Sequence, residues 1–137
     1  MIVAFDPGVT TGVAYQRGND VFVDQYAGSH KTFYAMLKSL EPSTLIVERF
    51  NYQRRDKVEL YPVEVIGILR LYAEQYDAVM IEQTPAQAKN FMTDDKLKKM
   101  GLWRAGMPHG HDAARHLMYY LIITKGETKW LNVLRPV

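Results

Sequence analysis

Two acidic residues, Asp6 and Glu48, each directly follow a short, mostly apolar run of the sequence, at 2–5 and 44–47. If these runs are parallel neighbouring strands, their ends lie about 4.8 Å apart, at the edge where open α/β sheets bind their ligands. Two carboxylates placed there repel each other unless a cation or a proton lies between them. One acidic residue after a strand is a common turn residue, but the pair favours a cation site.

A third candidate group, His109-Gly110-His111-Asp112, directly follows Pro108. His109 and Asp112 are three positions apart, so both can face one side of a helix that begins early enough. Carboxylates with one imidazole suit Mg²⁺ or Mn²⁺, whereas zinc favours more nitrogen or sulfur. Two such ions about 3.5–4 Å apart can activate water and stabilise the leaving oxygen in phosphodiester hydrolysis. The alternative is an ordinary first helical turn, with Asp112 favoured by the helix dipole and His111 exposed.

Composition limits the classes of protein that fit. The chain has 137 residues, of which 47% are apolar and 23% charged, and we expect one domain, 1–137, with its own core. It has no cysteine, which excludes disulfides, thiolate zinc sites and cysteine nucleophiles. No apolar run approaches the roughly 18 residues of a membrane span, and the N-terminus does not resemble a secretion signal. We expect a cytoplasmic protein, in the host-cell cytoplasm if a bacteriophage encodes it, with no membrane partner.

The order of apolar runs predicts an α/β sandwich. Strands are expected at 2–5, 12–15, 21–23, 44–47 and 78–81, and helices at 33–40, 62–76, 85–90, 94–100 and 110–122. The first three strands form an antiparallel meander. Each later strand–helix–strand passage implies a right-handed crossover between parallel strands.

Four segments together resemble the RuvC-type Holliday-junction resolvases of the RNase H-like superfamily. They are Asp6-Pro7-Gly8 with Thr11-Gly12-Val13-Ala14, then Ile46-Val47-Glu48-Arg49-Phe50, Pro85-Ala86-Gln87-Ala88-Lys89 and His109-Gly110-His111-Asp112-Ala113-Ala114. They occur in the family's order and extend over nearly the whole chain. The chain is shorter than typical bacterial members and lacks their basic glycine stretch at 96–103, so it looks more like the compact resolvases of bacteriophages.

The resemblance implies a fold and a reaction. The fold is a mixed five-stranded sheet with strand order 3-2-1-4-5, strand 2 antiparallel, flanked by helices. The implied catalytic and metal-binding set is Asp6, Glu48, His109 and Asp112, with two Mg²⁺ or Mn²⁺ ions bridged by Asp6. Water attacks the phosphodiester in line and leaves a 5′-phosphate and a 3′-hydroxyl. Family members commonly act as homodimers on four-way junctions, with one active site for each opposing strand.

Several basic and aromatic residues are candidate contacts to DNA. Basic residues form two clusters, one of Arg49, Arg54, Arg55 and Lys57, the other of Lys89, Lys96, Lys98, Lys99 and Arg104. They are either solvated surface charges or a DNA-binding face. By analogy with the family, Phe50 and Tyr52 wedge into a branched junction while Arg49, Arg54 and Arg55 meet phosphates. Lys89 is a candidate for stabilising phosphate charge.

Two features have open alternatives. The helix at 62–76 can supply a dimer interface through Ile66, Leu69 or Tyr72, although each is individually more typical of a core. Glu82 is an auxiliary acid near the site, a group that orients a metal ligand, or a solvated turn residue.

Three rival functions are weighed against a junction resolvase. Asp-x-Gly with a following Thr-Gly also opens the phosphate loop of actin-like sugar kinases, but those enzymes need two such domains and a second glycine-rich loop. A non-catalytic module that binds branched DNA fits less well, because all four metal positions hold usable ligands. A nuclease that acts on flaps, forks or RNA-containing duplexes remains open.

Overall fold

A five-stranded mixed sheet forms the centre of the protein, seen in a computed structural model that describes residues 1–50 and 60–134. The strands are β1 (Ile2–Asp6), β2 (Thr10–Arg17), β3 (Asp20–Ala27), β4 (Thr44–Glu48) and β5 (Val79–Gln83). Their order across the sheet is β3-β2-β1-β4-β5. Strand β2 is antiparallel to β1 and β3, whereas β1, β4 and β5 are parallel. The predicted strand order and the antiparallel second strand are confirmed.

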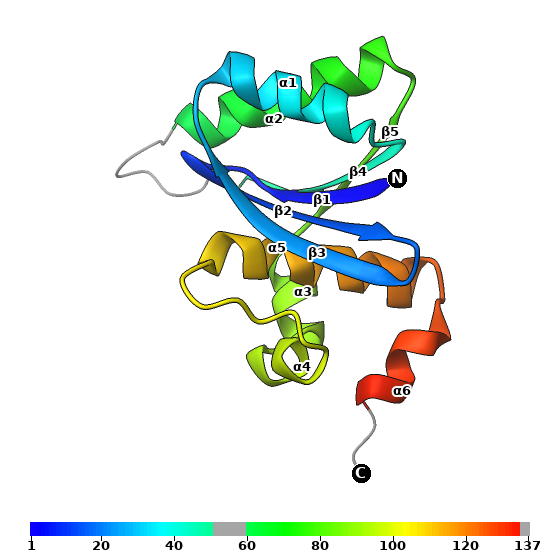
Figure 1. Cartoon of the computed structure of the whole chain (residues 1–137). Helices are drawn as coiled ribbons and strands as arrows, with labels where there is room; N and C mark the ends of the chain where they lie inside the picture. The colour runs from blue at the N-terminus through cyan, green and yellow to red at the C-terminus, as the bar shows by residue number, and fades with distance from the viewer. Residues whose placement is uncertain (51–59, 135–137) are drawn as a thin grey trace.

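Helices cover both faces of the sheet (Figure 1). Helices α1 (His30–Leu40) and α2 (Leu60–Gln75) pack on one face. Helix α5 (Pro108–Tyr119) packs on the other, with α3 (Pro85–Phe91) and α4 (Asp94–Lys99) beside it. A π-helical turn (Tyr120–Thr124), a 3₁₀ turn (Thr128–Trp130) and the short α6 (Leu131–Leu134) follow. No helix among the described residues is long and apolar enough to cross a membrane.

The alternation of side chains along the strands divides the core into two halves. In β1, Val3 and Phe5 face α1 and α2, while Ala4 faces α5, because successive strand residues point to opposite faces. Ala4 and Ala14 are both fully buried and small, which lets α5 lie close to the sheet. Helix α5 therefore packs directly on the central strands.

Local signals at the helix starts explain their positions. Ser29 caps α1, and Thr84 forms a reciprocal capping box with Gln87 at the start of α3. Helix α5 begins at Pro108, two residues before the predicted start, as expected for a proline in the first helical turn. This earlier start places His109 inside the first turn of α5.

Candidate metal centre and active site

The ends of β1 and β4 bring two of the predicted acids together. The two strands are parallel neighbours in which Phe5 is paired with Val47, so Asp6 and Glu48 follow at the same sheet edge. Their side chains are hydrogen-bonded to each other. In Figure 1 this edge and the start of α5 lie at the left of the molecule. The carboxylates therefore converge as their positions after two apolar runs predict.

The electrostatics of the pair show crowding of negative charge. Burial raises the pKa of Asp6 far above its ordinary value, and the hydrogen bond to Glu48 and the charges of Glu48 and Asp112 raise it further. Burial alone would also raise the pKa of Glu48, but the hydrogen bonds of His116 and Asp6 outweigh burial and lower it. Two carboxylates this close repel each other, and a proton or a cation between them relieves that repulsion.

His109 is placed beside Asp6 by contacts of the helix backbone. Its Nδ1 lies 3.3 Å from Oδ2 of Asp6. The backbone N–H groups of His109 and Gly110 donate to Oε1 of Gln25 on β3, at 2.9 and 3.3 Å. Since Met107 makes no side-chain cap bond, Gln25 supplies the cap from across the sheet. At Gly12, a Cβ would stand 1.8 Å from the carbonyl oxygen of His109, so only glycine permits this close approach.

Glu48 and Asp112 are each held by a basic side chain of α5. The Nε2 atom of His116 lies 3.4 Å from Oε1 of Glu48, and its Nδ1 lies 2.8 Å from Oε1 of Gln83. His116 is 1% exposed, so its ring is fixed between these two partners. Arg115 donates from Nε to Oδ1 of Asp112 at 3.3 Å. The turn of α5 that follows Asp112 therefore contacts both outer carboxylates.

The donor set fits a hard divalent cation in its chemistry. In the part of the chain that the structure describes, no group of three or more histidine or acidic residues is placed to hold a metal ion as the side chains stand. Asp6, Glu48 and Asp112 nevertheless offer carboxylate oxygens, and His109 adds one imidazole, which suits Mg²⁺ or Mn²⁺. Burial and the two other acids raise the pKa of Asp6. A bound cation would offset the same repulsion between the carboxylates.

Several solved structures have the same architecture as this chain. RuvC of Thermus thermophilus in complex with a Holliday-junction substrate matches with a TM-score of 0.69 at 14% identity, over 90% of this chain and 94% of that chain. The chain has the RuvC-type resolvase fold. A second structure of Thermus thermophilus RuvC gives a TM-score of 0.61 at 14% identity, over 90% and 96%. The fowlpox virus Holliday-junction resolvase gives 0.55 at 11%, over 88% and 97%. No family model and no curated protein matches the sequence.

Within this RuvC-type fold, a pocket of about 330 Å³ opens beside the acids. Glu48 and Asp112 line it together with Lys89, Arg49 and Phe50. The positive charge of Lys89 partly opposes the rise in the pKa of Asp6 that burial causes, and it contributes to the lowered pKa of Glu48. Lys89 therefore lies where a phosphate at the acids would meet a cation.

The other predicted DNA contacts have mixed outcomes. Tyr52, Arg54, Arg55 and Lys57 lie outside the described residues. The Nζ of Lys96 donates a hydrogen bond to the carbonyl of Phe91 at 2.7 Å and lies over the Phe91 ring, so its ammonium is engaged within the protein.

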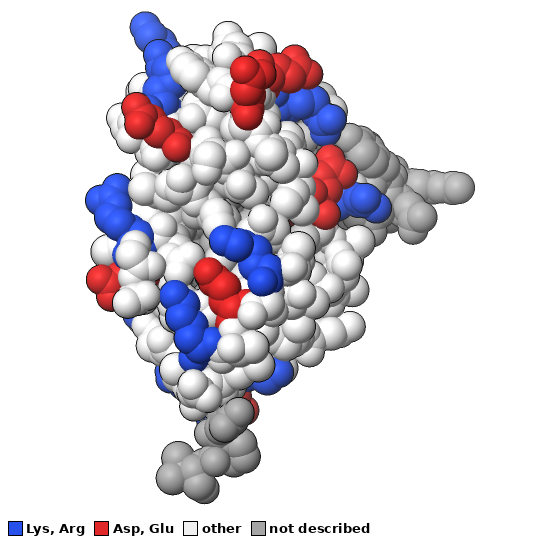
Figure 2. All heavy atoms as spheres, turned by 90° about the vertical axis from the view of Figure 1, so that its right-hand side faces the viewer, with Lys and Arg blue, Asp and Glu red and all other residues white. Residues whose placement is uncertain are grey.

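On the face opposite the site, Lys and Arg are interspersed with Asp and Glu, and the described residues form no large patch of one sign there (Figure 2).

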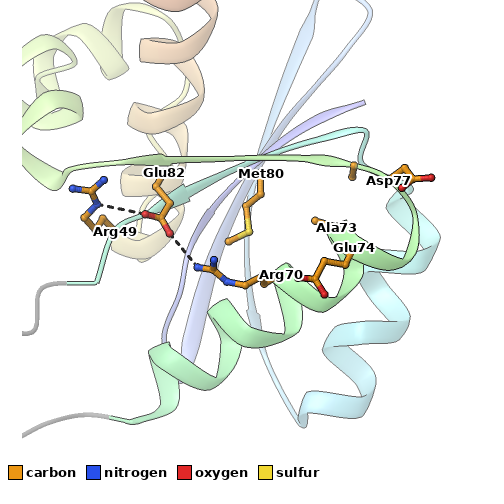
Figure 3. Close-up of a pocket in the computed structure, with 8 residues that line it drawn as sticks. Arg49, Arg70, Ala73, Glu74, Asp77, Met80 and Glu82 are labelled. Carbon is orange, nitrogen blue, oxygen red and sulfur yellow. Dashed lines mark hydrogen bonds and ion pairs between the residues drawn. The ribbon is translucent and has the colours of Figure 1, made fainter.

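Glu82 lies in β5 and belongs to a different surface from the acids. It is paired with Arg49 at 3.5 Å and with Arg70 at 3.2 Å. These residues line a second pocket of about 770 Å³, which shares Arg49 with the pocket beside the acids and extends along α2 to Asp77 (Figure 3). Glu82 is thus an exposed, ion-paired residue within β5 and not in the turn after it.

Sequence reasoning missed several residues that shape the site. His111, which the alternative of an ordinary helical turn would leave exposed, is buried, stacks on Trp103 and lies at hydrogen-bonding distance from the backbone of Arg104. Arg115 and His116 lie off the apolar stripe of α5, where periodicity predicts exposure, so no local pattern signals that both are buried. Gln25 has no local signal either, because its contact with His109 joins residues 84 positions apart.

Proposed function

We propose that the chain is a single-domain, divalent-metal-dependent endodeoxyribonuclease that cuts Holliday junctions or related branched DNA. The observation that carries the proposal is the convergence of Asp6 and Glu48, with Asp112 and His109, at one edge of a RuvC-type sheet. The proteins with this fold include a RuvC in complex with a Holliday-junction substrate. Shared fold alone does not fix activity, but the converging acids supply the chemistry.

The proposed catalytic set is Asp6, Glu48, His109 and Asp112, which would hold two Mg²⁺ or Mn²⁺ ions. When bound, such ions supply an activated water and stabilise the leaving oxygen of the phosphodiester. His109 either ligates or orients Asp6, with which it is in contact. Lys89 offsets phosphate charge from the wall of the pocket. The expected products carry a 5′-phosphate and a 3′-hydroxyl.

We also propose that the nuclease is a homodimer, since resolution of a junction requires cuts in two opposing strands. Of the residues expected at an interface, Leu69 and Tyr72 lie in the core and Ile66 is half-buried. The outer face of α2 instead exposes Leu60, Gly67 and Leu71, with the charged Glu64 among them, and these residues share one helix face. This face, apolar apart from Glu64, is our candidate interface. The proposed setting is the cytoplasm, that of a host cell if a bacteriophage encodes the protein.

Cleavage of labelled DNA tests the function. A four-way junction, a flap, a fork, an RNA-containing duplex and a linear duplex are compared in Mg²⁺, in Mn²⁺ and in EDTA. The expected result is paired, metal-dependent nicks in the junction that Asp6→Asn abolishes while DNA binding is retained, since binding rests on basic contacts.

Other results of this assay have distinct meanings. Preferred cutting of flaps, forks or RNA-containing duplexes would keep the metal-dependent nuclease and change the substrate. Tight binding of the junction without cutting in either metal would indicate a non-catalytic module. Joint loss of folding and binding in Asp6→Asn would indicate a structural role for Asp6.

A further inference from the structure

Arg115 is a buried cation whose three nitrogens are all engaged. Its side chain is 10% exposed. Nη1 donates to the carbonyl of Met92 at 2.7 Å, Nη2 to Oδ1 of Asp94 at 2.5 Å, and Nε to Oδ1 of Asp112 at 3.3 Å. A planar guanidinium can serve three acceptors in one fixed geometry, which a lysine ammonium does not reproduce. These three contacts therefore hold the guanidinium of Arg115 in one orientation.

The partners of Arg115 come from three different helices. Met92 is the C-cap residue of α3, Asp94 is the first residue of α4, and Asp112 lies in α5. Asp94 is 60% exposed on its side chain, yet the hydrogen bond from Arg115 lowers the pKa of Asp94. Arg115 thus connects the α3–α4 junction on the surface to an acid of the candidate metal site.

We propose that Arg115 is a positioning residue for Asp112, and that Asp94 holds Arg115 in place. The inference rests on the proposed metal-dependent nuclease and adds two residues that do not themselves reach the reacting atoms. Because Arg115 binds Oδ1, it restricts the rotation of the Asp112 carboxylate. The other oxygen, Oδ2, is then the one available to a cation. Groups that orient metal ligands in this way commonly change metal affinity by about 10- to 100-fold.

Two other roles give different expectations. If Arg115 only ties α3 and α4 to α5, its loss lowers stability without changing metal affinity. If its positive charge competes with the cation for Asp112, its loss tightens metal binding. Mn²⁺ binding by Arg115→Ala that is weaker, unchanged or tighter than wild type therefore distinguishes the positioning role, the structural role and the competing charge.

The test is a double-mutant cycle on Mn²⁺ affinity, measured by the electron paramagnetic resonance signal of free Mn²⁺ as the full chain is added. Arg115→Ala is expected to weaken Mn²⁺ binding by about 10-fold. Asp94→Ala is expected to weaken it by less. In the Arg115→Ala background, Asp94→Ala is expected to have no further effect, because its influence passes through Arg115. Arg115→Lys is expected to restore only part of the affinity.

The matched control is Asp95→Ala. Asp95 is exposed in the same first turn of α4 and, among the described residues, makes no bond to Arg115, so its removal tests the charge of the helix terminus alone. Mn²⁺ affinity unchanged from wild type is expected. Thermal unfolding of every variant shows which remain folded. Asp94→Ala, a surface change, keeps the test decisive if Arg115→Ala does not fold.

Four results would overturn the inference. They are unchanged Mn²⁺ affinity in Arg115→Ala, tighter binding in Arg115→Ala, equal Mn²⁺ affinity of wild type and Asp94→Ala, and equal weakening by Asp94→Ala and Asp95→Ala. Each leaves the proposed nuclease intact, provided that wild type binds Mn²⁺ and cuts DNA. Failure of wild type itself to bind Mn²⁺, with or without junction DNA, would overturn both proposals.

Discussion

Gly12 on β2 lies directly beneath His109, so that a Cβ at position 12 would stand 1.8 Å from the His109 carbonyl oxygen. Gly12 is also the residue paired with Asp6 across β1 and β2. The same contact therefore sets the distance between the sheet edge and the first turn of α5. A side chain at this position must push the helix away, because the atom it meets belongs to the backbone.

Gly12→Ala is therefore expected to destabilise the fold by about 1–3 kcal/mol, the usual range for overpacking, and to weaken Mn²⁺ binding. Urea unfolding and Mn²⁺ titration measure the two effects. Gly67→Ala is the control, since a Cβ there has no neighbour within 4 Å among the described residues of the same chain and alanine favours a helix by up to about 1 kcal/mol over glycine. Equal stability of Gly12→Ala and wild type would contradict the close packing of α5.

Gln25→Ala is expected to lower the free energy of unfolding by about 1 kcal/mol, the typical contribution of a helix cap. It removes the acceptor for the N–H groups of His109 and Gly110. Gln16→Ala on β2 is the control, because Gln16 makes no side-chain hydrogen bond among the described residues. A loss of stability that is the same in both variants would show that Gln25 acts only through the strand.

Removal of metal is expected to make stability depend on pH through Asp6. Its pKa is raised by burial and by Glu48, so the folded state retains a proton that the unfolded chain has released. The stabilising contribution is complete below the unfolded pKa of Asp6 and declines as pH rises toward the folded pKa, by up to about 1.4 kcal/mol per pH unit. Urea unfolding between pH 5 and pH 8 in EDTA measures the slope.

Asp6→Asn is the control for this slope, since an amide carries no titrating proton. The difference in slope between wild type and Asp6→Asn isolates the contribution of Asp6. Parallel curves in EDTA would show that Asp6 is ionised in the folded protein without metal. Saturating Mg²⁺ is expected to flatten the wild-type curve, because the cation replaces the proton.

Leu71→Glu is expected to convert the proposed dimer into monomers. Leu71 is 50% exposed on the outer face of α2, and a charge buried at an apolar interface without a partner is strongly unfavourable. Sedimentation equilibrium measures the mass. Ile123→Glu is the control, since Ile123 is 51% exposed beyond α5. A monomeric wild type, or dimers that persist in Leu71→Glu, would exclude this interface.

The parts of the fold that follow from hydrophobic patterning were predicted from the sequence. Asp6 and Glu48 stand where apolar runs end, and the spacing of His109 and Asp112 indicates a shared helix face. Only the resemblance to the RuvC-type resolvases implied that these two pairs meet at one edge. Periodicity did not separate Leu69, which is in the core, from Leu71, which is exposed, because α2 is apolar on most of its surface. The distinction depends on how the helix is rotated against the sheet.

Contacts between distant polar residues had no such pattern. Gln25 with His109 and Arg115 with Asp94 depend on tertiary packing that no local period encodes. The sequence also could not show that Lys96 bonds to the carbonyl of Phe91, since an exposed lysine in a basic cluster suits either role. For Tyr52, Arg54 and Arg55, the predicted contact with DNA remains a prediction.

The separation of Asp6 and His109, which are 103 positions apart, has a consequence for how the protein is made. During synthesis β1 to β4 leave the ribosome well before α5, so a growing chain holds at most the pair of Asp6 and Glu48. The full set of proposed ligands forms only after α5 has docked on the finished sheet, a step that depends on non-local contacts. For the proposed nuclease, a truncated or unfinished chain is therefore expected not to cut the DNA of the cell that synthesises it.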